Sequence, residues 1–226
     1  MDQSDLEGLG EPRPAREPLF NAPWTIVALC VGLVGLYLLQ SLTLSEADVD
    51  RLALSPRSLQ AGAWQGLIVS MFLHGGWAHV LMNALAAFAF GPPTARLMGT
   101  GPRGAFAFFA FYLTCGILAG LGYVAVNLND VNPVVGASGA VSGLLGAASR
   151  LIQGRGRIGP MFGRTVLGMA AAWAIVNVLL GVSGLTPGAV GIPVALQAHL
   201  AGYVAGVLLI GPFARLAGAP NIAFTQ

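Results

Sequence analysis

The chain has 226 residues, of which 55% are hydrophobic and only 9% are charged, and its formal net charge is +2. A soluble globular domain carries about 25% charged residues, so this composition excludes a protein whose whole surface faces water. We therefore expect an all-α, multi-pass membrane protein with no nucleic-acid partner.

The predicted elements begin after an acidic, proline-containing segment over 1–22, which we expect to be a disordered cytoplasmic tail. Six apolar stretches then predict six membrane-spanning helices within one domain over 23–214. They lie near 23–41, 76–92, 104–126, 138–151, 165–184 and 193–213. The apolar segment 64–73 belongs either to the second helix or to a half-immersed loop, and the fourth stretch is short for a complete crossing. Residues 215–226 are predicted to be a short cytoplasmic C-terminal tail.

The arginines predict how these helices are oriented, since all eleven basic residues are arginine. Six crossings put nine of them on one side: Arg13, Arg16, Arg96, Arg103, Arg150, Arg155, Arg157, Arg164 and Arg215. Only Arg51 and Arg57 fall on the other side. The positive-inside rule then places both termini in the cytoplasm. Compact loops and an Ala- and Gly-rich composition without lysine suggest a bacterial inner membrane.

Few strongly polar side chains lie in or beside the predicted helices, and polar groups in a bilayer are candidates for function. They are His74, His79, Asn83, Ser138, Asn177, Gln197 and His199. None is an acid, which excludes an intramembrane aspartyl protease and a His-Glu-x-x-His metalloprotease. His74 and His79 are about 140° apart around a helix, a poor spacing for a metal clamp, so we expect no metal and no cofactor. Asn177 is interpreted as an interhelical hydrogen bond rather than a catalytic group.

Three of these side chains are predicted to lie at one depth. Counted from Pro92, Arg150 and Pro212 at the expected cytoplasmic helix ends, they lie about 18–20 Å into the membrane. They are His79, Ser138 and His199. In a hydrocarbon core about 30 Å thick, this depth is about 10 Å below the outer face. Small-residue patterns in the fourth and sixth stretches (Gly139-x-x-x-Gly143 and Gly202-x-x-x-Gly206) allow close helix packing, which would bring His199 toward Ser138.

Four features together resemble the rhomboid family of intramembrane serine proteases. They are the run His74-Gly75-Gly76-Trp77-Ala78-His79 followed by Asn83, the run Gly136-Ala137-Ser138-Gly139, the pair Ala198-His199 followed by Gly202 and Gly206, and the six-span topology. The resemblance covers about 22–214. It implies a catalytic dyad in which Ser138 is the nucleophile and His199 is its general base.

The resemblance also implies an oxyanion hole made by His79, Asn83 and the Ser138 amide, in which each donor is worth about 3–4 kcal/mol. His74 would support the site by ordering the first outer loop. Three glycines would support it as well: Gly136, Gly139 and Gly202. The implied partners are transmembrane protein substrates and the lipid bilayer, and the site would open to the extracytoplasmic side.

Two positions depart from the family pattern. Gln65-Gly66 stands where members often carry Trp-Arg, and Ser142 stands where an aromatic ring often stacks on the base histidine. Ser142 is also a second hydroxyl on the same helix face as Ser138. The expected function is an intramembrane serine endopeptidase that cuts after a small side chain. The alternatives are a non-catalytic rhomboid-like protein that binds or retains membrane proteins, and a small transporter or channel.

Overall fold

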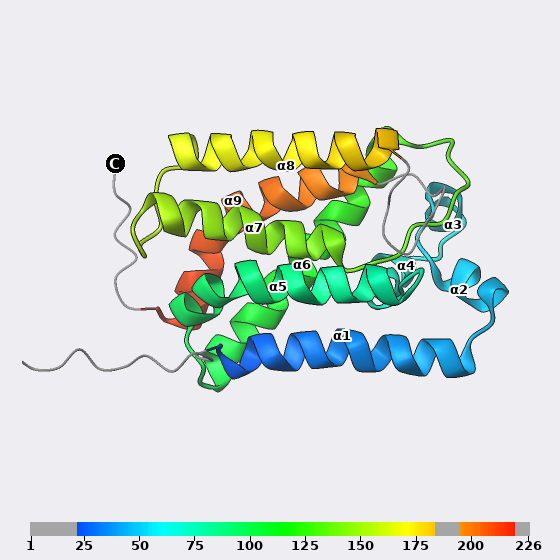
Figure 1. Ribbon diagram of the computed structural model, residues 1–226, viewed down its shortest axis with the longest axis horizontal. Coiled ribbons are helices and arrows are strands. Elements are labelled where there is room, and N and C mark those ends of the chain that lie inside the picture. The colour runs from blue at the N-terminus through cyan, green and yellow to red at the C-terminus, as the bar shows by residue number, and fades with distance from the viewer. Residues whose placement is uncertain (1–21, 184–194, 220–226) are drawn as a thin grey trace, which may run out of the picture.

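The computed structural model describes residues 22–183 and 195–219, and in them the protein is a bundle of long helices joined by short ones (Figure 1). The long helices are α1 (Trp24–Thr43), α5 (Trp77–Met98), α6 (Pro102–Val126), α7 (Ser138–Gln153), α8 (Arg164–Ser183) and α9 (Leu196–Ala217). The short ones are α2 (Glu46–Leu52), α3 (Pro56–Gln60), α4 (Gly66–Val69) and the 3-10 helix η2 (Ser70–Phe72). The predicted tails over 1–22 and 215–226 fall mostly outside the described residues, although α9 runs past the predicted boundary at 214.

Within the described residues, four helices are long and apolar enough to cross a membrane, namely α1, α6, α8 and α9. A fifth candidate is α5 together with the α4–η2 segment, from which it is bent by 96°. The segment 64–73 is therefore not a straight extension of the second span. The predicted all-α membrane fold is confirmed, whereas the six crossings and the cytoplasmic termini stay predictions.

Helix α7 lies at the centre of the bundle, where it contacts α5, α6, α8 and α9. Every residue of α7 from Gly139 to Leu151 is buried. With 16 residues it is shorter than the roughly 20 that a complete crossing needs. A short helix is tolerated at membrane depth when protein surrounds it, and this is the environment of α7. Helices α1 and α8 lie at opposite sides of the bundle, with α5 and α7 between them (Figure 1).

The predicted close packing of two glycine patterns is confirmed as a seam between α7 and α9. A Cβ atom built on Gly206 would lie 2.6 Å from the carbonyl carbon of Gly143. A Cβ atom on Gly202 would lie 2.9 Å from the carbonyl carbon of Gly139. Both distances are shorter than the 3.5–4.0 Å at which carbon atoms normally meet. Glycine at these positions therefore allows the two backbones to touch.

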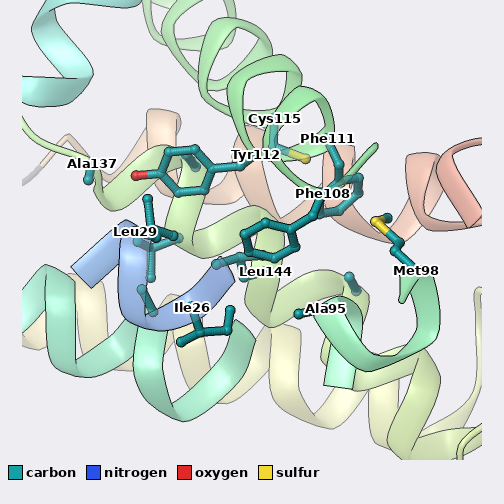
Figure 2. Close-up of a cluster of buried hydrophobic side chains, with 14 of the residues drawn as sticks. Ile26, Leu29, Ala95, Met98, Phe108, Phe111, Tyr112, Cys115, Ala137 and Leu144 are labelled. Carbon is teal, nitrogen blue, oxygen red and sulfur yellow. The ribbon is translucent and has the colours of Figure 1, made fainter. Parts of the chain in front are cut away.

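The largest cluster of buried apolar side chains includes contributions from α1, α5, α6 and α7 (Figure 2). Phe108 and Phe111 of α6 and Leu144 of α7 are completely buried there. At the far end of α7 from Ser138, Arg150 donates from Nε to the Gly159 carbonyl and from Nη1 to the Val207 carbonyl, each at 2.8 Å. Because lipid tails are as apolar as these side chains, close packing and such hydrogen bonds hold the helices together.

The sequence prediction placed two helix ends wrongly. Pro92 and Pro93 lie inside α5, which continues to Met98, and Pro212 lies inside α9, which continues to Ala217. Neighbouring helices can satisfy the backbone groups that a proline leaves free within a membrane bundle, so the helix need not stop. The depths counted from Pro92 and Pro212 therefore began at points inside the helices rather than at their ends.

Candidate active site

Ser138 is the first residue of α7, and the turn before it requires a glycine. Gly136 has a φ of +122°, which strains any residue with a side chain. A Cβ atom on Gly136 would also lie 2.7 Å from Nε2 of His79. The turn is held in place because the Gly136 amide donates to the Ser70 carbonyl at 2.8 Å. Gly136 thus allows the chain to turn into α7 at Ser138 while passing close to His79 of α5.

The two residues predicted to form a dyad lie within hydrogen-bonding distance of each other. Ser138 Oγ is 2.7 Å from His199 Nε2, across the α7–α9 seam. Both side chains are half-buried rather than sealed off. A hydroxyl that donates to Nε2 requires the ring proton to be on Nδ1, because a neutral imidazole carries one N–H. This geometry is suited to transferring the serine proton to the imidazole.

The other ring nitrogen of His199 meets α8. Its Nδ1 hydrogen-bonds Asn177 Oδ1, and Asn177 Nδ2 donates to the Trp173 carbonyl at 2.8 Å. The indole ring of Trp173 lies beside the imidazole, with ring centroids 5.8 Å apart. The prediction that Asn177 makes an interhelical hydrogen bond is confirmed, but sequence reasoning did not identify His199 as its partner.

Ser142 does not compete with Ser138 for His199. Its hydroxyl donates to the Ser138 carbonyl at 2.7 Å and accepts from Trp173 Nε1 at 3.2 Å. The aromatic ring that is missing at position 142 is therefore supplied by Trp173 from the neighbouring helix. Sequence reasoning missed Trp173, although its spacing four residues before Asn177 puts both on one helix face.

Two polar side chains of α5 approach the turn before Ser138. Gly75 N lies 3.4 Å from His79 Nδ1, toward which it donates, so the proton of His79 is left on Nε2, the atom nearest to Gly136. The position of a Cβ atom on Gly136 is 3.6 Å from Asn83 Nδ2. Asn83 is buried, and its Nδ2 has no hydrogen-bond partner among the described residues. Two N–H donors thus face the backbone that leads into Ser138.

His74 lies between α1 and the serine turn. Its main chain makes two hydrogen bonds with the side chain of Gln40, at 2.8 and 3.0 Å. The Ala137 amide points at His74 Nε2 from 3.5 Å, and the rings of His74 and His79 meet edge to face. His74 therefore links the end of α1 to the turn, in keeping with the supporting role predicted for it. Gln40 was missed by the sequence reasoning.

The departure at Gln65-Gly66 has a packing reason. Gly66 is buried, and a Cβ atom there would lie 3.3 Å from the Ala53 carbonyl oxygen. The α4 backbone thus lies directly against the segment that follows α2. Gln197, the remaining polar residue singled out from the sequence, is exposed.

A small cavity of about 50 Å³ opens beside Ser138. Its walls are mainly apolar or small residues from α4, η2, α6 and the segment before α7, among them Leu67, Met71, Gly116, Ala119 and Tyr123. A volume of this size holds only a few water molecules.

Comparison with known proteins adds independent information. A family model described as the rhomboid domain matches residues 61–215. The candidate rhomboid protease YdcA of Bacillus subtilis (strain 168) is 30% identical over 149 residues, which are 66% of this chain and 66% of YdcA. Rhomboid protease GluP of the same organism is 37% identical over 86 residues, or 38% of this chain and 15% of GluP.

RHOMBOID-like protein 9, chloroplastic, of Arabidopsis thaliana is 34% identical over 87 residues, covering 38% of this chain and 18% of that protein. The chain therefore aligns with less than two thirds of the length of each of these three relatives. The family match is much longer, covering more than half of the chain and including both Ser138 and His199. This protein belongs to the rhomboid family.

Proposed function

We propose that this protein is an intramembrane serine endopeptidase that hydrolyses peptide bonds in or near transmembrane segments of other proteins. The observation that carries the proposal is the 2.7 Å contact between Ser138 Oγ and His199 Nε2 at the start of a buried helix. The arginine distribution supports an orientation with both termini in the cytoplasm and the site toward the outside, and the Ala- and Gly-rich composition without lysine supports a bacterial inner membrane.

In the proposed reaction, Ser138 Oγ attacks the scissile carbonyl carbon while its proton passes to His199 Nε2. The tetrahedral intermediate collapses when the protonated imidazole gives that proton to the leaving amine, and an acyl-enzyme remains. His199 then takes a proton from water, whose oxygen attacks the ester and releases the new carboxyl end. The proton returns to Ser138 Oγ, so the enzyme ends as it began.

The negative charge on the carbonyl oxygen needs donors that are already in place. His79 Nε2 and Asn83 Nδ2 face the turn before Ser138, and the Ser138 amide is one of the unpaired N–H groups at a helix start. The lack of a partner for Asn83 Nδ2 among the described residues supports this role, because a buried amide without a partner is costly to keep. Removing one such donor costs about 3–4 kcal/mol of transition-state stabilisation.

The cavity beside Ser138 supports a preference for substrates with a small residue before the cut. Its small volume of about 50 Å³ favours short side chains such as Ala, Gly or Ser. A substrate helix must also unwind locally before its carbonyl can reach Ser138. Segments with Gly, Ala, Ser or Pro near the outer face unwind at the lowest cost.

The test is cleavage of such a transmembrane substrate by the purified protein in lipid vesicles. The wild type is expected to cleave the substrate and to be labelled by a fluorophosphonate, whereas Ser138→Ala is expected to do neither. Ser149→Ala is a matched control on the same helix, because Ser149 lies three helical turns from Ser138 and its hydroxyl donates to the Gly146 carbonyl. A folded wild type that neither cleaves nor labels, yet retains transmembrane segments as well as Ser138→Ala does, would instead be a rhomboid-like binder.

A further inference from the structure

The site is closed by a ring of hydrogen bonds that runs through five residues of three helices. Ser138 Oγ bonds His199 Nε2, and His199 Nδ1 bonds Asn177 Oδ1. Asn177 Nδ2 donates to the Trp173 carbonyl. The ring closes through Trp173 Nε1, which donates to Ser142 Oγ, and Ser142 Oγ, which donates to the Ser138 carbonyl. Helix α8 is therefore hydrogen-bonded to both neighbouring helices of the site, to Ser142 of α7 through Trp173 and to His199 of α9 through Asn177.

The direction of each bond in this ring is determined by chemistry. The Trp173 carbonyl can only accept, so the Asn177 amide must turn its NH₂ toward Trp173 and its oxygen toward His199. That oxygen also only accepts, so it requires the N–H of the imidazole to be on Nδ1. With Nδ1 protonated, Nε2 is left with a lone pair for the Ser138 proton. Asn177 therefore selects the tautomer that a general base needs.

The burial of Asn177 also supports a role in holding His199. Among the 20 residues of α8, only Val166 and Asn177 are buried. A polar side chain at one of these two positions costs free energy unless its hydrogen bonds are made, and both groups of this amide are paired. An apolar residue would anchor the helix without that requirement. The position is thus occupied by a residue whose hydrogen bonds lead to the base.

We propose that Asn177 is a positioning residue that orients His199 within a hydrogen-bonded relay of contacts, Ser138–His199–Asn177, in which Trp173 fixes the amide and no proton passes to Asn177. The proposal rests on the proposed proteolytic function. Asn177 does not touch substrate; it acts by holding the imidazole ring and its tautomer, as the third member of other hydrolase triads does. The neutral amide performs this role without a buried charge, which suits a site whose helices contain no acid.

The test compares Asn177→Leu, Asn177→Asp and Asn127→Leu with the wild type in vesicles. Leucine removes both hydrogen bonds at similar size, and aspartate restores an oxygen acceptor for Nδ1–H. Asn127 is the matched control, because its Nδ2 makes the same type of bond to the carbonyl four residues earlier, also at 2.8 Å, but faces no histidine. Titration with a fluorophosphonate gives the fraction of competent sites, so that kcat refers to folded enzyme.

For Asn177→Leu we expect kcat to fall about 10- to 100-fold with KM unchanged, since a misplaced base slows chemistry without changing substrate binding. Asn177→Asp is expected to recover most of that loss, and Asn127→Leu to match the wild type. A purely structural role of Asn177 instead predicts fewer competent sites with a normal kcat, and no recovery by aspartate. A normal kcat in Asn177→Leu, or a lowered kcat that aspartate does not recover, overturns the proposal. If the wild type cleaves and Asn177→Leu keeps its kcat, the relay is wrong while proteolysis stands. If the wild type itself fails to cleave, both fall.

Discussion

Replacing Gly206 by alanine tests whether the α7–α9 seam sets the distance between the proposed nucleophile, Ser138, and its proposed base, His199. The new Cβ atom would lie 2.6 Å from the Gly143 carbonyl carbon, about 1 Å closer than carbon atoms tolerate. If the helices part by about that amount, the 2.7 Å distance between Ser138 Oγ and His199 Nε2 lengthens beyond the usual hydrogen-bond range.

Two separate losses are expected for Gly206→Ala. Overpacking of this kind costs about 1–3 kcal/mol of stability. A displacement of about 1 Å at the reacting groups costs up to about 100-fold in turnover. Position 206 lies two helical turns from His199, so the substitution adds no atom to the site itself.

The assay is the rate of substrate cleavage in vesicles together with the midpoint of thermal unfolding. Gly35→Ala in α1 is the matched control, because a Cβ atom there meets nothing within 4 Å. The control should be as active as the wild type. Wild-type turnover and stability in Gly206→Ala would show that the seam yields to an extra methyl group, and the reasoning would then be wrong.

Two other predictions concern the supports of the site. Gln40→Leu leaves the buried main-chain N–H and C=O of His74 unpaired, at about 1–3 kcal/mol each, and should lower the thermal midpoint. Hydrogen bonds from the Asn132 amide and the Tyr123 hydroxyl hold the pKa of Asp130 below its usual value. A lowered pKa stabilises the folded loop above about pH 4 and less at lower pH, so the protection of the amides over 127–134 from hydrogen exchange, relative to their intrinsic exchange rate at each pH, should fall on acidification. Asp130→Asn should remove that pH dependence, and an unchanged profile would contradict the assignment.

The sequence located the long helices well because the bilayer imposes a simple requirement. A stretch of about 20 apolar residues is needed for a crossing, and each such stretch became a helix within the described residues. The errors fell at prolines, where α5 and α9 continue past Pro92 and Pro212. Proline removes one hydrogen bond from a helix interior, but packed neighbours in a membrane bundle can compensate for the lost bond.

The site was predictable as far as its residues fall in short motifs. Ser138 and His199 lie within such motifs, and the structure brings their side chains together. Gln40 and Trp173 do not, because their roles come from contacts with residues that are 34 and 31 positions away in the chain. Sequence spacing reports which side chains share a helix face, but it does not report which helix lies opposite.

Helices α8 and α9 support the proposed base, His199, unequally. In the most apolar stretch of α8, only 11% of the residues are buried inside the protein, whereas the corresponding share for α9 is 44%. Helix α9 is also joined to α7 by touching backbones. One side of His199 is therefore held by rigid protein, and the other by a helix that borders the surrounding lipid. The thickness and lateral pressure of the bilayer act directly on that helix. In the proposed protease, a change of lipid is therefore expected to alter turnover while leaving the fold intact.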